Sequence, residues 1–349
     1  MSKHDSFLGQ EVTYNADEGT LVRFHGSAFG GGGFLFGHHG GGTTPAPTLV
    51  TSSASHLEFN LIWDSSVANL GSNQAAFMNA MTNAAKYYET LFTTPQTEIV
   101  NIKVGWGEVG GSSLPAGALG ASESNGYLTN YSTVTSHLAP HGFSFSASNE
   151  PTGAQFFISS TEAKSFGLIS PTYAGVDGYV GFGTLAGTGY SWNFSSTATT
   201  GQGSGTGALQ FDFQGVAQHE ISEVMGRISM EGHTTFNGVA TYTPLDLFNF
   251  DSATHLVLSG GSNASTQVAS YFSTDNGTTP LASFNDGYQG GDIADWASYG
   301  SYAQSGTGLS GHQDAFDAFA YPGVNTDLSS ADQVVMETLG VSPTGVAIT

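Results

Sequence analysis

The alternation of apolar and polar side chains places the first regular elements after residue 50. Residues 57–63, Leu-Glu-Phe-Asn-Leu-Ile-Trp, alternate as a strand with one buried face does. Between residues 73 and 92, apolar side chains return at spacings of four and three, which predicts a helix with one buried stripe. Pro95 ends this helix, and residues 98–106 are predicted to form a second strand.

Shorter segments follow and complete the pattern. They predict, in order, a short helix, two strands and a longer helix, at residues 161–166, 178–182, 190–194 and from about 213 onward. A final helix is expected at about 330–339, where Ser330 and Gln333 fit a capping box and Gly340 fits the stop. This order of strands and helices predicts an α+β fold.

Composition divides the chain into three stretches. Residues 1–50 are rich in glycine and are expected to form an N-terminal extension. Residues 51–250 carry the predicted strands and helices. Residues 251–349 are rich in Gly, Ser and Asp and are expected to form a loop-rich C-terminal subdomain that ends in the final helix.

The net negative charge of the chain disfavours some classes of binding partner. Six Lys and Arg residues stand against 28 Asp and Glu residues, a formal net charge of −22. Such a surface repels phosphate backbones and anionic lipids, so nucleic acid is not an expected partner. No apolar run approaches the roughly 18 residues of a membrane span, so membrane insertion is not expected. Dispersed acidic side chains in glycine-rich loops suit calcium, a hard cation that prefers oxygen ligands.

The absence of cysteine excludes disulfides and thiolate metal sites. The first residues lack the charged and then apolar layout of a cleaved signal peptide. The acidic, cysteine-free and glycine-rich composition resembles that of bacterial type I secretion substrates. We therefore expect an extracellular protein that is exported by a non-classical or type I route.

The segment that carries candidate chemistry is Gly215-Val-Ala-Gln-His-Glu-Ile-Ser-Glu-Val-Met-Gly-Arg227. On a helix, His219 and Glu223 share a face and can chelate one ion. Glu220 lies beside His219 and can reach a water molecule held at that face. A carboxylate in this position can act as general base on a water molecule that a zinc ion has made more acidic.

This segment resembles the metzincin zinc metalloproteases, whose pattern is H-E-x-x-H-x-x-G-x-x-H followed by a Met-turn. His219, Glu220 and Gly226 match the first ligand, the base and the glycine turn of that pattern. Residues 242–248 stand where the Met-turn would lie, with Leu245 in place of Met. Bacterial secreted metalloproteases with an H-E-x-x-E-V-M-G-R motif are more similar still. The resemblance covers roughly residues 55–340.

The resemblance implies a twisted mixed sheet, an active-site helix, a zinc cofactor and a polypeptide substrate. Two departures concern the ligands: Glu223 replaces the second His of the pattern, and Ser229 stands at the third. A carboxylate can ligate zinc, so His219 and Glu223 remain a workable pair. The third ligand must come from elsewhere. Asp246 is the first candidate and His233 is the second.

Other interpretations of these residues stay open. Glu223 and Arg227 have the spacing of a helix ion pair, which would need no metal. The carboxylates within residues 290–296 and 314–317 could bind calcium or cap turns. The leading hypothesis is a secreted zinc endopeptidase in which Glu220 is the base. The alternative is a degenerate protease scaffold that serves as an extracellular structural, filament or adhesive protein, with possible self-assembly.

Overall fold

The structure of the chain is a computed structural model that describes residues 11–15, 19–25, 35–36, 43–115, 117–145, 149–197, 205–231, 234–236, 238–258, 270–285, 292–297 and 314–345. It is a mixed α/β fold built around one large central sheet, which is compatible with the expected α+β class. Among the described helices, none is both long and apolar enough to cross a membrane.

The central sheet combines parallel and antiparallel pairs. Its main path runs β15-β16-β11-β10-β12-β7-β5-β4. The bounds in chain order are β4 (Thr48–Val50), β5 (Leu57–Trp63), β7 (Glu98–Trp106), β10 (Gly120–Thr129), β11 (Gln155–Ser159), β12 (Gly178–Phe182), β15 (Thr234–Phe236) and β16 (Val239–Tyr242). Parallel pairs join β5 to β7, β7 to β12 and β11 to β16, and the other pairs along this path are antiparallel. The hairpin of β1 (Glu11–Asn15) and β2 (Gly19–His25) attaches to β10.

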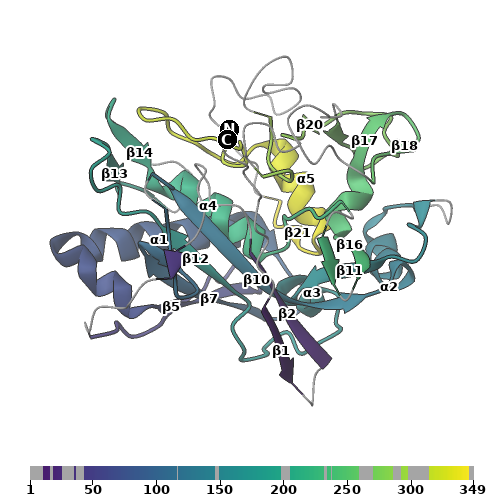
Figure 1. The fold of residues 1–349 in the computed structure, drawn as a ribbon, viewed down its shortest axis with the longest axis horizontal. Coiled ribbons are helices and arrows are strands. Elements are labelled where there is room, and N and C mark those ends of the chain that lie inside the picture. Colours follow the sequence, from purple (N-terminus) through teal and green to yellow (C-terminus); the bar gives the residue numbers. More distant parts are fainter. Residues whose placement is uncertain are drawn as a thin grey trace.

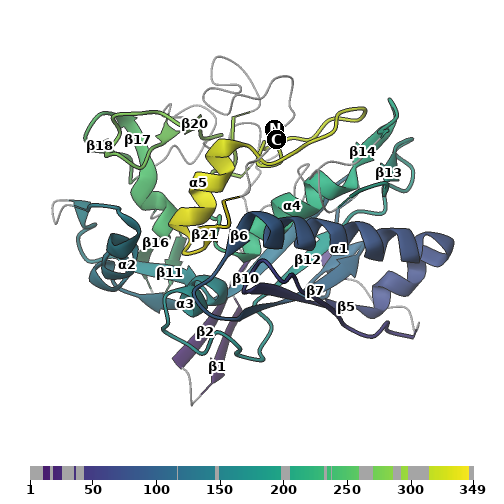
Figure 2. The same cartoon turned by 180° about the vertical axis from the view of Figure 1, so that it is seen from behind.

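The described helices are α1 (Gln74–Leu91), α2 (Tyr131–Leu138), α3 (Ser160–Ser165), α4 (Phe213–Val224) and α5 (Ser330–Thr338). Short 3-10 helices span Ser65–Asn73, Ala139–His141 and Pro244–Phe248. Figure 1 and Figure 2 show α1 and α4 alongside each other on one side of the sheet, with α5 beyond α4 and the β1–β2 hairpin projecting on the other side. The helix that carries the candidate chemistry is therefore in the middle of the molecule.

Smaller sheets surround this centre. They pair β3 (Leu35–Phe36) with β9 (Ser112–Ser113) and β9 with β8 (Glu108–Val109), β6 (Phe92–Thr93) with β21 (Ser342–Pro343), and β13 (Ser191–Asn193) with β14 (Gln210–Asp212). A four-stranded sheet contains β17 (Asn249–Ser252), β18 (His255–Leu256), β19 (Tyr271–Phe272) and β20 (Ala282–Ser283). The β6–β21 pair ties the last described residues to the end of α1.

The core lies between the sheet and the helices. In β5, every second side chain is buried, as its alternating sequence requires. Phe77 of α1 and Phe213 of α4 meet with ring centroids 5.1 Å apart, and Phe182 of β12 joins them at 4.6 Å from Phe213. One hydrophobic cluster includes side chains from Val50 to Val341, so α4 is packed on all sides.

The structure confirms most of the predicted elements and corrects some details. Strands 57–63, 98–106 and 178–182 have the predicted bounds, whereas β10 and β11 were not predicted at all. The capping box of α5 lies one residue earlier than predicted. Ser329 is the N-cap, and the Asp332 carboxylate accepts the N–H of Ser329 at 2.8 Å.

Candidate metal centre

Helix α4 begins at a capped end and is held from two sides. The Asp212 side chain accepts the N–H of Gln214 at 3.2 Å and so caps the helix. From α1, the Tyr88 hydroxyl donates to the carbonyl of Gln218 at 2.8 Å, and from β10, the Ser124 hydroxyl donates to the carbonyl of Glu223 at 2.9 Å. All twelve residues of the helix are buried. Its polar side chains are therefore fixed inside the protein.

The helix ends where only glycine fits. Gly226 has a φ of 117°, a conformation that other residues rarely adopt. A Cβ atom at this position would also lie 2.5 Å from the carboxyl carbon of Glu162. The chain then turns back, and the N–H of Arg227 donates to the carbonyl of Ser222 at 3.0 Å. This turn brings the Arg227 side chain alongside the last turn of α4.

Three buried side chains come together at α4 and could hold a metal ion. The Nε2 atom of His219 lies 3.4 Å from Oε1 of Glu223 and 3.3 Å from Oδ1 of Asp295, and all three candidate ligand atoms lie within 4.8 Å of one another. Ligand atoms about 2.0–2.1 Å from a tetrahedral zinc ion lie about 3.3–3.4 Å apart, so these distances fit zinc. We call His219, Glu223 and Asp295 the α4 centre.

Neighbouring groups orient the ligands as a metal site requires. The Nδ1 atom of His219 donates to the carbonyl of Ala315 at 2.8 Å, which leaves Nε2 facing the two carboxylates. The Ser122 hydroxyl of β10 donates to Oε2 of Glu223 at 2.7 Å and leaves Oε1 toward His219. Such partners fix the ring orientation and the carboxylate plane, and they commonly support metal ligands.

Arg227 also contacts the α4 centre. Its Nη1 lies 2.6 Å from Oδ1 of Asp295, and its Nη2 lies 3.4 Å from Oε1 of Glu223. Its Nε donates to the Ser222 hydroxyl at 2.7 Å, and its guanidinium lies 4.4 Å from the centroid of the Phe316 ring. The Glu223–Arg227 ion pair, which the helix spacing also predicts, is therefore present. Arg227 contacts Oε1 of Glu223 and Oδ1 of Asp295, the same oxygen atoms that would bind a metal ion.

The charges of the centre compensate one another. Burial alone would lower the pKa of His219, but the charge of Asp295 and the hydrogen bonds to Asp295 and Glu223 together outweigh burial and raise that pKa to about 10. Burial would raise the pKa of Asp295, but the positive charges of His219 and Arg227 outweigh it and lower that pKa. Without a metal ion, a protonated His219 bridges the two carboxylates. A metal ion would replace that proton.

Glu220, the expected base, is next to the centre, and its carboxyl group lies beside that of Glu223. Among the described residues, neither of its carboxylate oxygens has a hydrogen-bond partner, and the side chain is fully buried. Burial, followed by the charge of Glu223, raises the pKa of Glu220 well above its ordinary value. Gly120 of β10 makes room for the carboxylate, because a Cβ atom there would lie 2.2 Å from Oε1 of Glu220.

Asp246, the first candidate for the third ligand, does not belong to this group. Its carboxylate accepts hydrogen bonds from the Ser229 hydroxyl and from three backbone N–H groups, those of Met230, Glu231 and Thr243. It thereby completes the capping box of the 3-10 helix Pro244–Phe248. The structure brings Asp295 to the third position instead. His233, the second candidate, lies outside the described residues.

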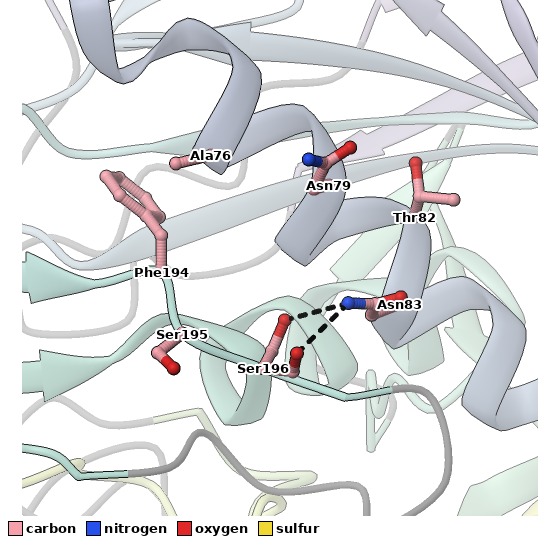
Figure 3. Close-up of a pocket in the computed structure, with 7 residues that line it drawn as sticks. All are labelled: Ala76, Asn79, Thr82, Asn83, Phe194, Ser195 and Ser196. Atoms are coloured by element: carbon pink, nitrogen blue, oxygen red, sulfur yellow. Dashed lines mark hydrogen bonds between the residues drawn. The ribbon is translucent and has the colours of Figure 1, made fainter.

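The sequence offered only a weak signal for Asp295. It lies in the acidic segment 290–296, whose carboxylates could bind calcium or cap turns, and only the fold brings it to His219 and Glu223 of α4. The centre itself is enclosed, because none of its three side chains is more than 2% exposed. A surface cavity of about 440 Å³ lies elsewhere, between α1 and the Phe194–Ser196 segment (Figure 3). It is lined by neutral residues and contains no residue of the α4 centre.

Comparisons with known proteins do not assign the chain. No protein-family model, no curated protein and no solved structure matches it significantly.

Proposed function

We propose that the protein is a metal-dependent endopeptidase in which His219, Glu223 and Asp295 hold a zinc ion. The observation that carries this proposal is the spacing of the three ligand atoms, 3.3 and 3.4 Å from Nε2 of His219, beside a buried carboxylate with no partner among the described residues. The resemblance to metzincins supports the same assignment for His219 and Glu220.

The residues would divide the chemistry between them. A zinc ion supplies Lewis-acid chemistry, which polarises a water molecule and a peptide carbonyl. Glu220 would accept the proton of the attacking water, because its carboxylate is beside the proposed ligand Glu223. Glu223 would stay a ligand, held by the Ser122 hydroxyl.

A second candidate function is a non-catalytic scaffold. Two observations favour it: the enclosure of the α4 centre and the contacts of Arg227 with both ligand carboxylates. In this case the same helix would be held by a buried ionic network, and the acidic surface would serve an extracellular structural or adhesive role. Peptidase activity and metal content together distinguish the two functions.

The metal is tested by elemental analysis of the purified protein after dialysis against zinc. We expect about one zinc ion per wild-type chain and none in His219→Ala. The matched control is His255→Ala, because His255 also forms an i, i+4 pair with a carboxylate, that of Asp251, but on the surface. Equal zinc content in wild type and His219→Ala would contradict the proposed site.

The identity of the third ligand is tested by Asp295→Asn, with Asp251→Asn as a control at a partly exposed carboxylate. We expect Asp295→Asn to lower the affinity for zinc by at least ten-fold, whereas Asp251→Asn leaves it unchanged. If Asp246→Asn abolished zinc binding while the folded state was retained and Asp295→Asn did not, the third ligand would be Asp246. The activity is tested with a broad set of unfolded polypeptides. A fully metallated protein that cleaves none of them would support the scaffold.

A further inference from the structure

The last third of the chain has many carboxylates and very few cationic partners. No lysine or arginine follows Arg227, whereas twelve Asp and Glu residues do. Arg227 is already occupied by Glu223 and Asp295. Of the lysines with described side chains, Lys103 pairs with Asp64 and Lys164 pairs with Asp177, both far earlier in the sequence.

Two of these carboxylates belong to one rigid turn, Asp314 to Asp317. The N–H of Phe316 donates to Oδ1 of Asp314 at 2.8 Å, and the N–H of Ala315 donates to the carbonyl of Asp327 at 2.7 Å. Backbone bonds also join the turn to Trp296, whose N–H donates to the carbonyl of Phe316 at 2.8 Å. The backbone of the turn is therefore fixed, and it also holds the Asp314 carboxylate through the N–H of Phe316.

Asp317 is the unexplained member of this turn. Its side chain is 1% exposed, and within the described part of the chain neither of its carboxylate oxygens has a hydrogen-bond partner. The Oδ2 atom of Asp314 has none either. The neighbouring Asp332 differs, because it accepts the indole N–H of Trp296 at 2.6 Å and the N–H of Ser329 at 2.8 Å. Asp332 thereby caps α5 and holds Trp296. Its carboxyl group also interacts with that of Asp314, because burial, followed by the charge of Asp314, raises the pKa of Asp332 well above its ordinary value.

A buried carboxylate without partners is costly and must be neutralised. Either a proton or a cation can do this. Asp314 and Asp317 belong to one turn, in which the N–H of Asp317 donates to the carbonyl of Asp314 at 3.3 Å. Burial, followed by the charge of Asp314, raises the pKa of Asp317 well above its ordinary value. The two carboxylate oxygens of Asp317, which have no hydrogen-bond partner in the described part of the chain, and the carboxylate of Asp314 in the same turn are suitable donors for a hard cation.

We propose that Asp314 and Asp317 bind a second divalent cation of the calcium type, at a site separate from the α4 centre. The donors are oxygen atoms only, which favours calcium over zinc, whereas the α4 centre contributes an imidazole nitrogen. The turn also connects the two sites, because the carbonyl of Ala315 accepts the Nδ1–H of His219. A cation on this turn would fix the residue that orients the zinc ligand.

The test is thermal unfolding of the metal-free full chain with increasing CaCl₂. Four proteins are compared: wild type, Asp317→Asn, His219→Ala and the partly exposed control Asp251→Asn. For wild type we expect a midpoint increase on the order of 5 °C at a calcium concentration well above the dissociation constant. His219→Ala and Asp251→Asn should respond as the wild type does, and Asp317→Asn should not respond.

The behaviour of Asp317→Asn without calcium makes the test decisive. The amide has nearly the shape of the carboxylate but no charge to bury, so in EDTA this variant should unfold at or above the wild-type midpoint. A missing calcium response in a protein of normal stability then reports the lost ligand and not a damaged fold. No response in wild type, or an equal response in Asp317→Asn, would overturn the proposal. Loss of the response in His219→Ala would assign the calcium effect to the α4 centre. None of these results depends on zinc content or peptidase activity.

Discussion

Two buried ionic networks in this protein look similar and differ in one respect. In the first, Lys164 pairs with Asp177, and the carboxylate also accepts hydrogen bonds from the Ser160 hydroxyl at 2.8 Å and the N–H of Asn101 at 2.7 Å. The Lys164 ammonium also donates to the carbonyl of Ile99 at 2.6 Å. One cation meets one anion, and every carboxylate oxygen has a donor. This network is complete within the protein.

The α4 centre differs, because within the described ranges not every carboxylate oxygen in and beside it has a hydrogen-bond donor. His219 and Arg227 face Glu223 and Asp295, but the adjacent Glu220 carboxylate has no donor among the described residues. An ion pair that only stabilised α4 would not require the additional buried carboxylate of Glu220. An apolar side chain of similar size at this position would cost less free energy to bury. The first network is complete within the protein, whereas under the proposed function the second retains an unfavourable group for chemistry.

The largest expected effect concerns Glu220. Glu220→Gln keeps the shape of the side chain but removes the group that accepts the proton, so peptidase turnover should fall about 10²–10⁴-fold. Zinc content should stay at the wild-type level, and the free energy of unfolding should stay equal or rise, because a buried carboxylate is removed. Glu223→Gln should instead lower zinc occupancy together with the rate. An unchanged rate in Glu220→Gln would remove its role as base.

The complete network should show the opposite behaviour. Lys164→Met leaves the Asp177 carboxylate buried without its cation, which should lower the free energy of unfolding by about 3–5 kcal/mol. Lys103→Met is the control, because the Lys103–Asp64 pair is partly exposed and should cost no more than about 1 kcal/mol. Urea unfolding measures both. Similar costs for the two variants would contradict the distinction between a buried network and a surface pair.

Glu162 is a buried carboxyl group that belongs neither to the Lys164–Asp177 network nor to the α4 centre, and it should make the stability of the protein depend on pH. Burial raises the pKa of Glu162 to about 8, from an ordinary value of 4.5. The folded state therefore favours the protonated form, and this contribution to stability is complete below about pH 4.5 and is lost as the pH rises through 8.

Glu162→Gln should remove this loss, because the amide keeps an oxygen that can accept the N–H of Ser159. Relative to the variant, the wild type should lose on the order of a few kcal/mol of unfolding free energy between pH 5 and pH 9. Urea unfolding at these two pH values provides the measurement. Parallel pH profiles for the two proteins would show that the pKa of Glu162 is not raised.

The smallest expected effect concerns the space that Gly120 leaves for Glu220. A methyl group at residue 120 would press on Oε1 of Glu220, so Gly120→Ala should lower the free energy of unfolding by about 1–3 kcal/mol. In a Glu220→Ala background the same change should cost less, since the obstructing carboxylate is gone. Equal costs in both backgrounds would mean that Gly120 is required for another reason.

The sequence alone determined the elements whose patterns are local. Alternation over residues 57–63 predicts β5, and apolar spacings of three and four predict α1, because burial of one face produces a regular period. The helix spacing also predicts that His219 and Glu223 share a face, which the distance of 3.4 Å confirms. These features depend on residues only a few positions apart.

Tertiary structure decided the features that join distant residues. The central strand β10 has the small and polar sequence Gly-Ala-Ser-Glu-Ser-Asn-Gly, which does not favour a strand. It forms because strands pair along its edges, and it needs small residues because Ser122 and Gly120 lie against α4. The replacement of Asp246 by Asp295 has the same origin. A spacing pattern shows which side chains share a helix face, but only the folded chain shows which distant carboxylate is already used for capping and which one reaches that face.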